Sequence, residues 1–344
     1  MKTVFITGAS GYIGGDILTE LIEKYPVYNY RLLVRGERSK AEIKSVYPSV
    51  SIVCGDLNDS DILTEESAGA DIVIHTADAA DHLSAAQAIA KGALKMHTPD
   101  RPLYWLHTSG AGLLSFYDEE AKVYGERSSR IHDDVKDIDE ILSLPDRAFH
   151  RVVDKTVLHA GAENPAVLKT AIISPTTVYG TGRGPCSQRS RQIYEMAKFI
   201  LKENKIPVVG RGQSIGSNVH VRSVTRLNMH LFEAAIQQRD ENLFWGSNAY
   251  YLVEQGEHCW GDVANSIAQK ATEEGLLSEP HERIELDMKS AYKLAGFEAT
   301  SWGYNMRCRA SRARSLLGWQ PSGLSLDDEL PQIIREEYNR LQQD

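Results

Sequence analysis

The chain begins with a short apolar run that leads directly into a glycine-rich turn. Residues 3–7 read TVFIT, and the GASGYIG that follows places Gly8, Gly11 and Gly14 three residues apart. Glycines at this spacing allow a tight turn, a close backbone approach to a pyrophosphate, and close packing of a helix on the preceding strand. The N-terminus of that helix offers free N–H groups and a positive dipole end to phosphate. The feature predicts a strand–turn–helix unit that binds a dinucleotide.

Short apolar segments alternate with helical ones through the first half of the chain. Strands separated by helices are joined by right-handed crossovers into a parallel sheet that is covered on both faces. Near-continuous apolar strands fit burial on both sides. We therefore predict an α/β fold, a Rossmann-type doubly wound parallel sheet. The predicted strands are 3–7, 30–34, 51–55, 71–76, 103–109 and 166–174.

The sequence changes character after Pro175. TTVYGTGRGPCSQRSRQ, rich in glycine, arginine and small polar residues, reads as a long functional loop. Mainly helical segments follow, with one further strand expected at 248–254. We expect a dinucleotide-binding domain over 1–179, completed by about 217–254. A smaller, interleaved, mainly helical substrate-binding lobe is expected over 180–216 and 255–344.

The composition excludes several classes of partner. The 344 residues carry a formal net charge of -9, which argues against binding to nucleic acid or to anionic membranes. The N-terminal residues run straight into a strand, and no apolar run is long enough to span a bilayer. Four cysteines lie far apart without a CxxC pair, which favours a reduced cytoplasmic protein: Cys54, Cys186, Cys259 and Cys308.

The end of the second strand carries basic residues. Dinucleotide folds selective for NAD place an Asp or Glu there for the ribose 2′-hydroxyl, whereas an Arg accommodates the 2′-phosphate of NADP. This chain has Arg35 at that point, with Arg38 and Lys40 just behind. We therefore expect NADP, contacted by Arg35 and Lys40, in preference to NAD. Solvated surface charges are the alternative interpretation.

Two further turns follow strands of the predicted sheet. Asp56 in GDLND offers a carboxylate to the adenine amino group, and Leu57 can pack on the ring. Thr76 and Ala77 in HTAD are small enough to let the backbone approach a ribose. Ligands of open parallel sheets bind at the carboxyl ends of the strands. This position favours a cofactor role over that of an ordinary turn.

The sequence resembles the extended short-chain dehydrogenase/reductase superfamily, in its group of NAD-dependent epimerases and dehydratases. The carrying motifs, in the family's order, are TGASGYIG, GDL, HTA, LHTSGAG, Lys155, SPTTVYGTG, NVHV and LLGWQPS. Arg35 and the TSGAG stretch look more like NADP-dependent reductases of the dihydroflavonol-reductase type. The resemblance implies that the cofactor also contacts Ser10, Tyr12, Ile13, Lys155, Pro175 and Thr177.

The resemblance also implies a catalytic set. In such enzymes a Ser or Thr after the fifth strand holds the substrate oxygen, a Tyr exchanges a proton, and a Lys four residues later lowers the pKa of that Tyr. Ser109, with Thr108 second, matches the first position, and Lys155 matches the last. The position four before Lys155 is Arg151, whose guanidinium stays charged and cannot act as a general acid near neutral pH.

Another group would then have to supply the proton. His150 is adjacent, and imidazole titrates near neutrality, although one step along a helix turns a side chain by about 100°. Tyr117 and Tyr124 lie in the loop expected after the fifth strand, whereas Tyr179 matches a Tyr that usually packs structurally in the family. His150 and Tyr124 are the candidates, with ordinary packing as the alternative for each.

The long loop is rich in arginine. Arginine forks bind carboxylate or phosphate in a bidentate manner, so Arg183, Arg189 and Arg191 favour an anionic or strongly polar small-molecule substrate. Pairing with the protein's own carboxylates is the alternative. His220 in NVHV is expected at the junction of the lobes, within reach of the pocket. The eleven histidines show no metal-ligand spacing, so no metal is expected.

Three functions fit these observations. The favoured one is an NADP-dependent oxidoreductase acting on a carbonyl or alcohol, with a displaced proton donor. A nucleotide-sugar epimerase or dehydratase is the second. The third is a non-catalytic regulatory protein that senses NADP. A homodimer would be usual for the family.

Overall fold

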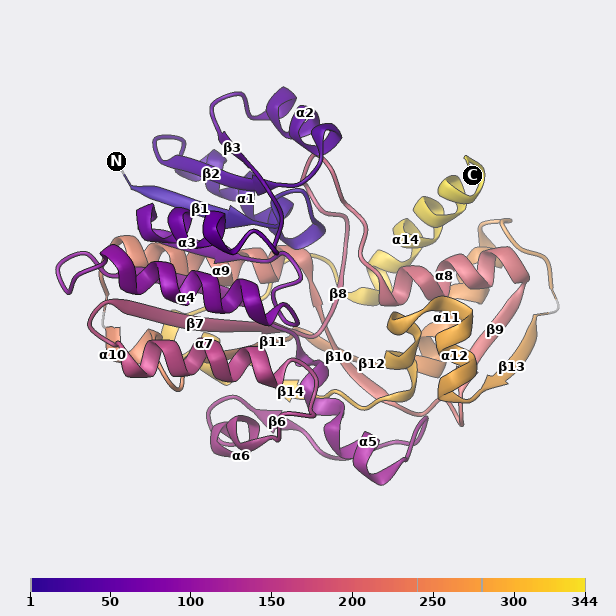
Figure 1. Cartoon of the computed structure of the whole chain (residues 1–344). Helices are drawn as coiled ribbons and strands as arrows, with labels where there is room; N and C mark the ends of the chain where they lie inside the picture. The colour runs from indigo at the N-terminus through magenta and orange to yellow at the C-terminus, as the bar shows by residue number, and fades with distance from the viewer. Residues whose placement is uncertain (1, 240, 280, 344) are drawn as a thin grey trace.

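Seven parallel strands form the main sheet of the computed structural model, which describes residues 2–239, 241–279 and 281–343 (Figure 1). Their order across the sheet is β11-β7-β5-β4-β1-β2-β3. Because the order reverses beside β1, this is a doubly wound sheet, and the predicted fold class is confirmed. The strands are β1 (Thr3–Thr7), β2 (Asn29–Val34), β3 (Ser51–Cys54), β4 (Ile72–His75), β5 (Leu103–Thr108), β7 (Leu168–Pro175) and β11 (Tyr250–Val253).

Helices cover both faces of this sheet. The alternation of side chains along β5 shows how each face is filled: Tyr104 and Leu106 pack with α1 and α9, whereas Trp105 packs with α4 and α7. Figure 1 shows α3, α4 and α7 side by side over the second face. The covering helices are α1 (Tyr12–Lys24), α2 (Glu37–Val46), α3 (Ser60–Gly69), α4 (Leu83–Met96), α7 (Arg151–Glu163), α9 (Val221–Ile236) and α13 (Ser311–Leu317).

A second group of elements, with its own apolar core, lies beside the carboxyl ends of the strands (Figure 1). Its core is packed between α8, α11 and α14 and includes two buried tryptophans, Trp260 and Trp302. The predicted division of the chain into two domains at the stated boundaries stays a prediction. The main elements are α8 (Gln192–Glu203), β9 (Lys205–Val209), α11 (Trp260–Glu273), β13 (Glu282–Leu286), α12 (Met288–Ala295), η2 (Phe297–Gly303) and α14 (Leu326–Leu341).

Short elements link the two parts. A three-stranded sheet joins the end of the main sheet to the second group through β8, β10 and β12. No helix within the described residues is long and apolar enough to cross a membrane. The linking elements are η1 (Ala111–Ser115), α5 (Phe116–Ala121), β6 (His132–Asp133), α6 (Ile138–Ser143), β8 (Thr177–Tyr179), β10 (Ile215–His220), α10 (Glu241–Phe244), β12 (Gly256–Cys259) and β14 (Cys308–Arg309).

The region between β5 and β7 differs from the sequence expectation. The segment after β5, expected as a loop, contains η1 and α5, so Tyr117 lies on a helix. The long helical stretch expected before β7 is divided into α6 and α7. His150 precedes α7 with φ of +67°, a left-handed conformation that is rare for residues other than glycine.

Candidate active site

The glycine turn brings β1, α1 and β4 into close contact. Gly8 has φ of +80°, and a Cβ on it would lie 2.3 Å from Oγ1 of Thr76. A Cβ on Gly14 would lie 2.2 Å from the carbonyl oxygen of Gly8. The hydroxyl of Thr76 donates a 2.8 Å hydrogen bond to the carbonyl of Thr7 and fixes the end of β4 against the turn. Only glycine therefore fits at positions 8 and 14 in this geometry.

The N-terminus of α1 is open towards a ligand. Gly11 caps the helix and offers no side chain to the first-turn N–H groups. The N–H groups of Tyr12, Ile13 and Gly14 have no intrahelical partner in an α-helix, and all three residues line a cavity. Free N–H groups at the positive end of a helix dipole fit a pyrophosphate. The residues present therefore fit a dinucleotide cofactor.

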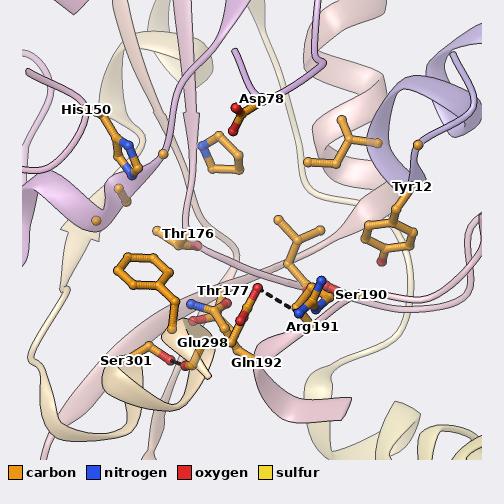
Figure 2. Close-up of a pocket in the computed structure, with 18 of the residues that line it drawn as sticks. Tyr12, Asp78, His150, Thr176, Thr177, Ser190, Arg191, Gln192, Glu298 and Ser301 are labelled. Carbon is orange, nitrogen blue, oxygen red and sulfur yellow. Dashed lines mark hydrogen bonds and ion pairs between the residues drawn. The ribbon is translucent and has the colours of Figure 1, made fainter. Parts of the chain in front are cut away.

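The cavity has a volume of about 580 Å³ and runs from the glycine turn to the second group of elements. Tyr12 and His150 lie on opposite sides of it (Figure 2). Several residues expected to bind cofactor line it together with the turn: Ser10, Thr76, Ala77, Pro175 and Thr177. No cluster of three or more His, Cys, Asp or Glu suited to a metal occurs in the described part of the chain.

His150 extends its imidazole into this cavity (Figure 2). Its Nδ1 lies 2.8 Å from Oδ1 of Asp81, and its side chain is 13% exposed. The ring lies against the turn after β5, because a Cβ on Gly110 or Gly112 would be only 3.0 or 2.9 Å from Nε2. One ring nitrogen therefore pairs with a carboxylate while the other lies at a glycine-lined wall. A histidine held in this way has the arrangement of a general acid or base.

The two residues that align with the family's Tyr and Lys lie outside the cavity. Arg151 is buried, and its guanidinium donates to the backbone carbonyls of Leu142 and Leu144. Lys155 is exposed and pairs with Asp146. Arg151 therefore anchors the start of α7 to the end of α6, and Lys155 is not among the residues that line the cavity.

His150 and Asp154 form a second pair of residues four apart, at the start of α7. Asp154 follows His150 by one helical turn and is completely buried. Its Oδ2 accepts a 2.9 Å hydrogen bond from the hydroxyl of Tyr250. Burial raises the pKa of Asp154 to about 6, and the hydroxyls of Ser109 and Tyr250 partly oppose the shift. His150 and Asp154 each come one residue before an aligned position; His150 faces the cavity, and Asp154 contacts Tyr250 of the sheet.

The Ser/Thr pair lies at the end of β5. Thr108 and Ser109 are both buried, and the backbone N–H of Ser109 donates to Ile173 in β7. Ser109 lies next to Asp154, and the Gly110 that follows it lines the cavity. Ser109 is therefore buried beside Asp154 and is not among the residues that line the cavity.

The expected 2′-phosphate site is solvent-exposed. Arg35 is exposed at the end of β2 and makes no ion pair within the described residues. Lys40 pairs with Glu37 at 3.3 Å. Oδ1 of Asp56 accepts a 2.7 Å hydrogen bond from the N–H of Asn58 and so shapes the turn after β3. Leu57 packs against the core under α3 and α4.

Two of the three loop arginines are held by the protein's own carboxylates. Arg183 forms ion pairs with the buried Asp16 and with Glu20, and it lies away from the cavity. Arg189 lines the cavity but is paired with Glu337 at 2.8 Å and with Glu195 at 2.7 Å.

The third arginine lies at the edge of the cavity, where it meets η2. Arg191 pairs with Glu298 at 3.1 Å (Figure 2). Its side chain is 61% exposed. This ion pair spans the two segments that close the cavity on the side of the second group of elements.

The two remaining candidates lie near the cavity without lining it. His220 caps α9, and its ring packs against Tyr179 and beside Gly180 and Gly323. Burial lowers the pKa of His220 to about 4, so it is neutral at physiological pH. Tyr124 packs against Tyr304 with ring centroids 5.7 Å apart. Both side chains support the walls of the site.

Several cavity residues escaped the sequence reasoning. Most come from the turn before α7 and from the later part of the chain, where no short motif marks them, whereas Asp78 follows β4. Asp81 and Asp154 also escaped it, although the HRVVD stretch holds a His and an Asp at the helical spacing of four. The additional lining residues include Asp78, Phe149, Gln192, Phe297, Glu298, Thr300, Ser301, Tyr304 and Met306.

Comparison with known proteins gives matches that extend over most of the chain. Residues 4–243 match the NAD dependent epimerase/dehydratase family. The oxidase ucsJ of Acremonium sp is 35% identical, and the alignment covers 99% of both chains. Among solved structures, a mutant of UDP-glucuronic acid 4-epimerase from Bacillus cereus superposes with a TM-score of 0.66 at 16% identity, over 99% of each chain.

A second solved structure superposes on this chain equally well. The dTDP-glucose 4,6-dehydratase DesIV from Streptomyces venezuelae, with NAD and TYD bound, has a TM-score of 0.66 at 17% identity. It covers 98% of this chain and 97% of its own. At such low identity, the two solved structures show only that the fold is shared. The family match and the 35% identical oxidase show homology. The chain belongs to the NAD-dependent epimerase/dehydratase family, within the extended short-chain dehydrogenase/reductase superfamily.

Proposed function

We propose that the protein is an NADP(H)-dependent oxidoreductase that interconverts a carbonyl and an alcohol, with His150 in the role of the family's Tyr. The observation that carries the proposal is the position of His150. Its imidazole faces the same cavity that begins at the open N-terminus of α1. The 35% identity to an oxidase over the whole chain supports redox chemistry.

His150 is the group that moves the proton. A bound dihydronicotinamide would supply the hydride for the carbonyl carbon. As the C=O bond becomes C–O–H, protonated His150 gives its Nε2 proton to the oxygen and becomes neutral. The carboxylate of Asp81 lies 2.8 Å from Nδ1 and orients the ring. In the oxidation direction the same nitrogen accepts the alcohol proton.

Arg35 supports the assignment of NADP. Its guanidinium is exposed at the end of β2 and has no carboxylate partner in the described residues. The neighbouring Arg38 pairs with Glu42 at 2.8 Å. Arg35 is therefore the cation available to a ribose 2′-phosphate.

Calorimetric titration with NADPH, NADP, NADH and NAD tests this assignment. We expect the phosphorylated forms to bind at least tenfold more tightly, and Arg35→Ala to remove this preference. Arg38→Ala serves as the matched control, because Arg38 is already ion-paired. Preference for NAD in the unsubstituted protein would refute the NADP assignment and favour a nucleotide-sugar epimerase.

A screen of carbonyl compounds that follows NADPH oxidation tests the catalytic part. Turnover that is lost in His150→Gln, with unchanged NADPH affinity, is the expected result. Tight NADPH binding with no turnover of any compound would instead support the NADP-sensing alternative.

A further inference from the structure

Positive charge at the substrate end of the cavity is already neutralised. Arg189 and Arg191 are the arginines among the described lining residues. Arg189 is paired with Glu337 and Glu195. Arg191 is paired with Glu298, and its Nε lies 3.6 Å from Glu195. Three carboxylates thus face two guanidinium groups, and this part of the site offers no unpaired arginine to an anion.

Aromatic side chains form a wall at the same end. The rings of Phe149 and Phe297 pack edge to face with centroids 5.6 Å apart, and Phe149 and Tyr304 lie 6.5 Å apart. Met306 adds an apolar side chain to the lining. Phe297 is 53% exposed. An exposed phenyl ring at a cavity loses its contact with water when an apolar ligand binds, which favours binding.

The wall adjoins the proposed proton donor. Phe149 directly precedes His150, and their ring centroids are 6.2 Å apart. A flat ring packed on this wall would therefore hold a carbonyl attached to it close to the imidazole. The neutral polar groups of Gln192, Thr300 and Ser301 also line the cavity and can bind a polar substituent without demanding a charge.

We propose that the substrate is a neutral aromatic carbonyl compound, or the matching alcohol, which packs on the wall of Phe149, Phe297 and Tyr304. The inference rests on the proposed function for the reaction, but the class of ligand follows from the wall and the paired arginines alone. The two phosphates of a nucleotide sugar would have to replace carboxylates on Arg189 and Arg191, and would lie near Glu298.

Direct binding to the full chain saturated with NADP tests the ligand class without turnover. The probes are 1-tetralone, which is neutral and aromatic, 2-naphthoate, which is aromatic and anionic, and UDP-glucose, a nucleotide sugar. Calorimetry should show 1-tetralone binding at least tenfold more tightly than either anion. Equal or tighter binding of 2-naphthoate or UDP-glucose, or no binding of 1-tetralone, would overturn the proposal.

Substitutions of Phe297 and Glu298 test the aromatic wall and the ion pair separately. Phe297→Ala should weaken 1-tetralone binding about tenfold through lost apolar contact, whereas Tyr292→Ala, at an exposed tyrosine outside the cavity, should not. Glu298→Gln releases Arg191 and should strengthen 2-naphthoate binding several-fold with little effect on 1-tetralone. An unchanged affinity of Phe297→Ala for 1-tetralone would contradict the proposed role of the wall in ligand binding.

The failure of this proposal differs from that of the proposed function. If NADP itself does not bind, the oxidoreductase assignment fails, and the three probes are titrated against the chain alone. If NADP binds and 1-tetralone does not, only the substrate class fails.

Discussion

Nδ1 of His150 lies 2.8 Å from Oδ1 of Asp81, and this contact joins the turn before α7 to the loop that follows β4. Asp81 is 59% exposed, whereas the His150 side chain is 13% exposed. The carboxylate thus approaches the imidazole from the solvent side, and the ring directs its other edge towards Gly110 and Gly112. In the proposed function, Asp81 positions the ring and His150 exchanges the proton with the substrate.

Asp81→Asn should lower kcat about tenfold and leave KM and NADPH affinity nearly unchanged. The amide keeps the size of the side chain but replaces the carboxylate beside Nδ1, and so should disturb the orientation of the ring. Steady-state kinetics with the best substrate from the carbonyl screen, followed by calorimetry with NADPH, measures both quantities. A rise in KM with constant kcat would instead assign Asp81 to substrate binding.

His150→Gln should reduce kcat by about 10²–10⁴-fold, the range typical for loss of a general acid. Lys155→Met is the matched comparison, since Lys155 is exposed and pairs with Asp146 away from the cavity. We expect Lys155→Met to retain most of the activity and its affinity for NADPH. Loss of both properties in Lys155→Met would show that Lys155 reaches the cofactor in the working enzyme.

Gly14→Ala should abolish measurable NADPH binding and lower the melting temperature. The added Cβ would lie 2.2 Å from the carbonyl oxygen of Gly8, so the turn must open to admit it. Gly69→Ala is the control, because a Cβ there meets no atom within 4 Å. Calorimetry and thermal unfolding monitored by circular dichroism compare the two variants. Normal NADPH binding by Gly14→Ala would remove the glycine turn from the cofactor site.

Asp154 should make the protein less stable as the pH rises from about 4 to about 6. Burial raises its pKa to about 6 in the folded state, whereas an unfolded Asp releases its proton near pH 4. Between these values the folded chain holds more protons than the unfolded chain, so the free energy of unfolding falls with pH, by about 2–3 kcal/mol in total.

Urea unfolding at pH 4, 5, 6 and 7 checks this dependence. Asp154→Asn keeps the shape but cannot ionise, so its curve should lack the Asp154 contribution. Asp134, with a pKa raised by burial to about 7, titrates in both proteins and cancels in the comparison. Parallel curves for the two proteins would contradict the raised pKa of Asp154.

The sequence predicted the sheet well because its signals are local. The strand at Thr3–Thr7 and the glycine turn after it lie where expected, since the apolar run and the glycine spacing specify both. The extra strand β11 pairs with β7 at the edge of the sheet, also as expected.

The position of His150 at the cavity could not be predicted from the sequence, for a physical reason. Alignment on Lys155 places Arg151 at the position of the catalytic Tyr, because the family's pattern is a Tyr followed four residues later by a Lys. The left-handed conformation of His150 and the hydrogen bonds from Arg151 to Leu142 and Leu144 set which face of α7 meets the sheet. Neither feature is marked by a sequence motif. The aromatic wall is equally hidden, since Phe149 and Phe297 lie 148 positions apart in the chain.

The adjacency of Phe149 and His150 ties substrate recognition to reaction rate. Under the two proposals, the adjoining residues Phe149 and His150, the second of them in the left-handed region, carry the side chain that contacts the ligand and the side chain that exchanges the proton. A change that widens the wall on this side also moves the acid. Substitutions of Phe149 should therefore change substrate range and turnover together. Relatives that act on other substrates should differ at Phe297 or Tyr304 more often than at Phe149.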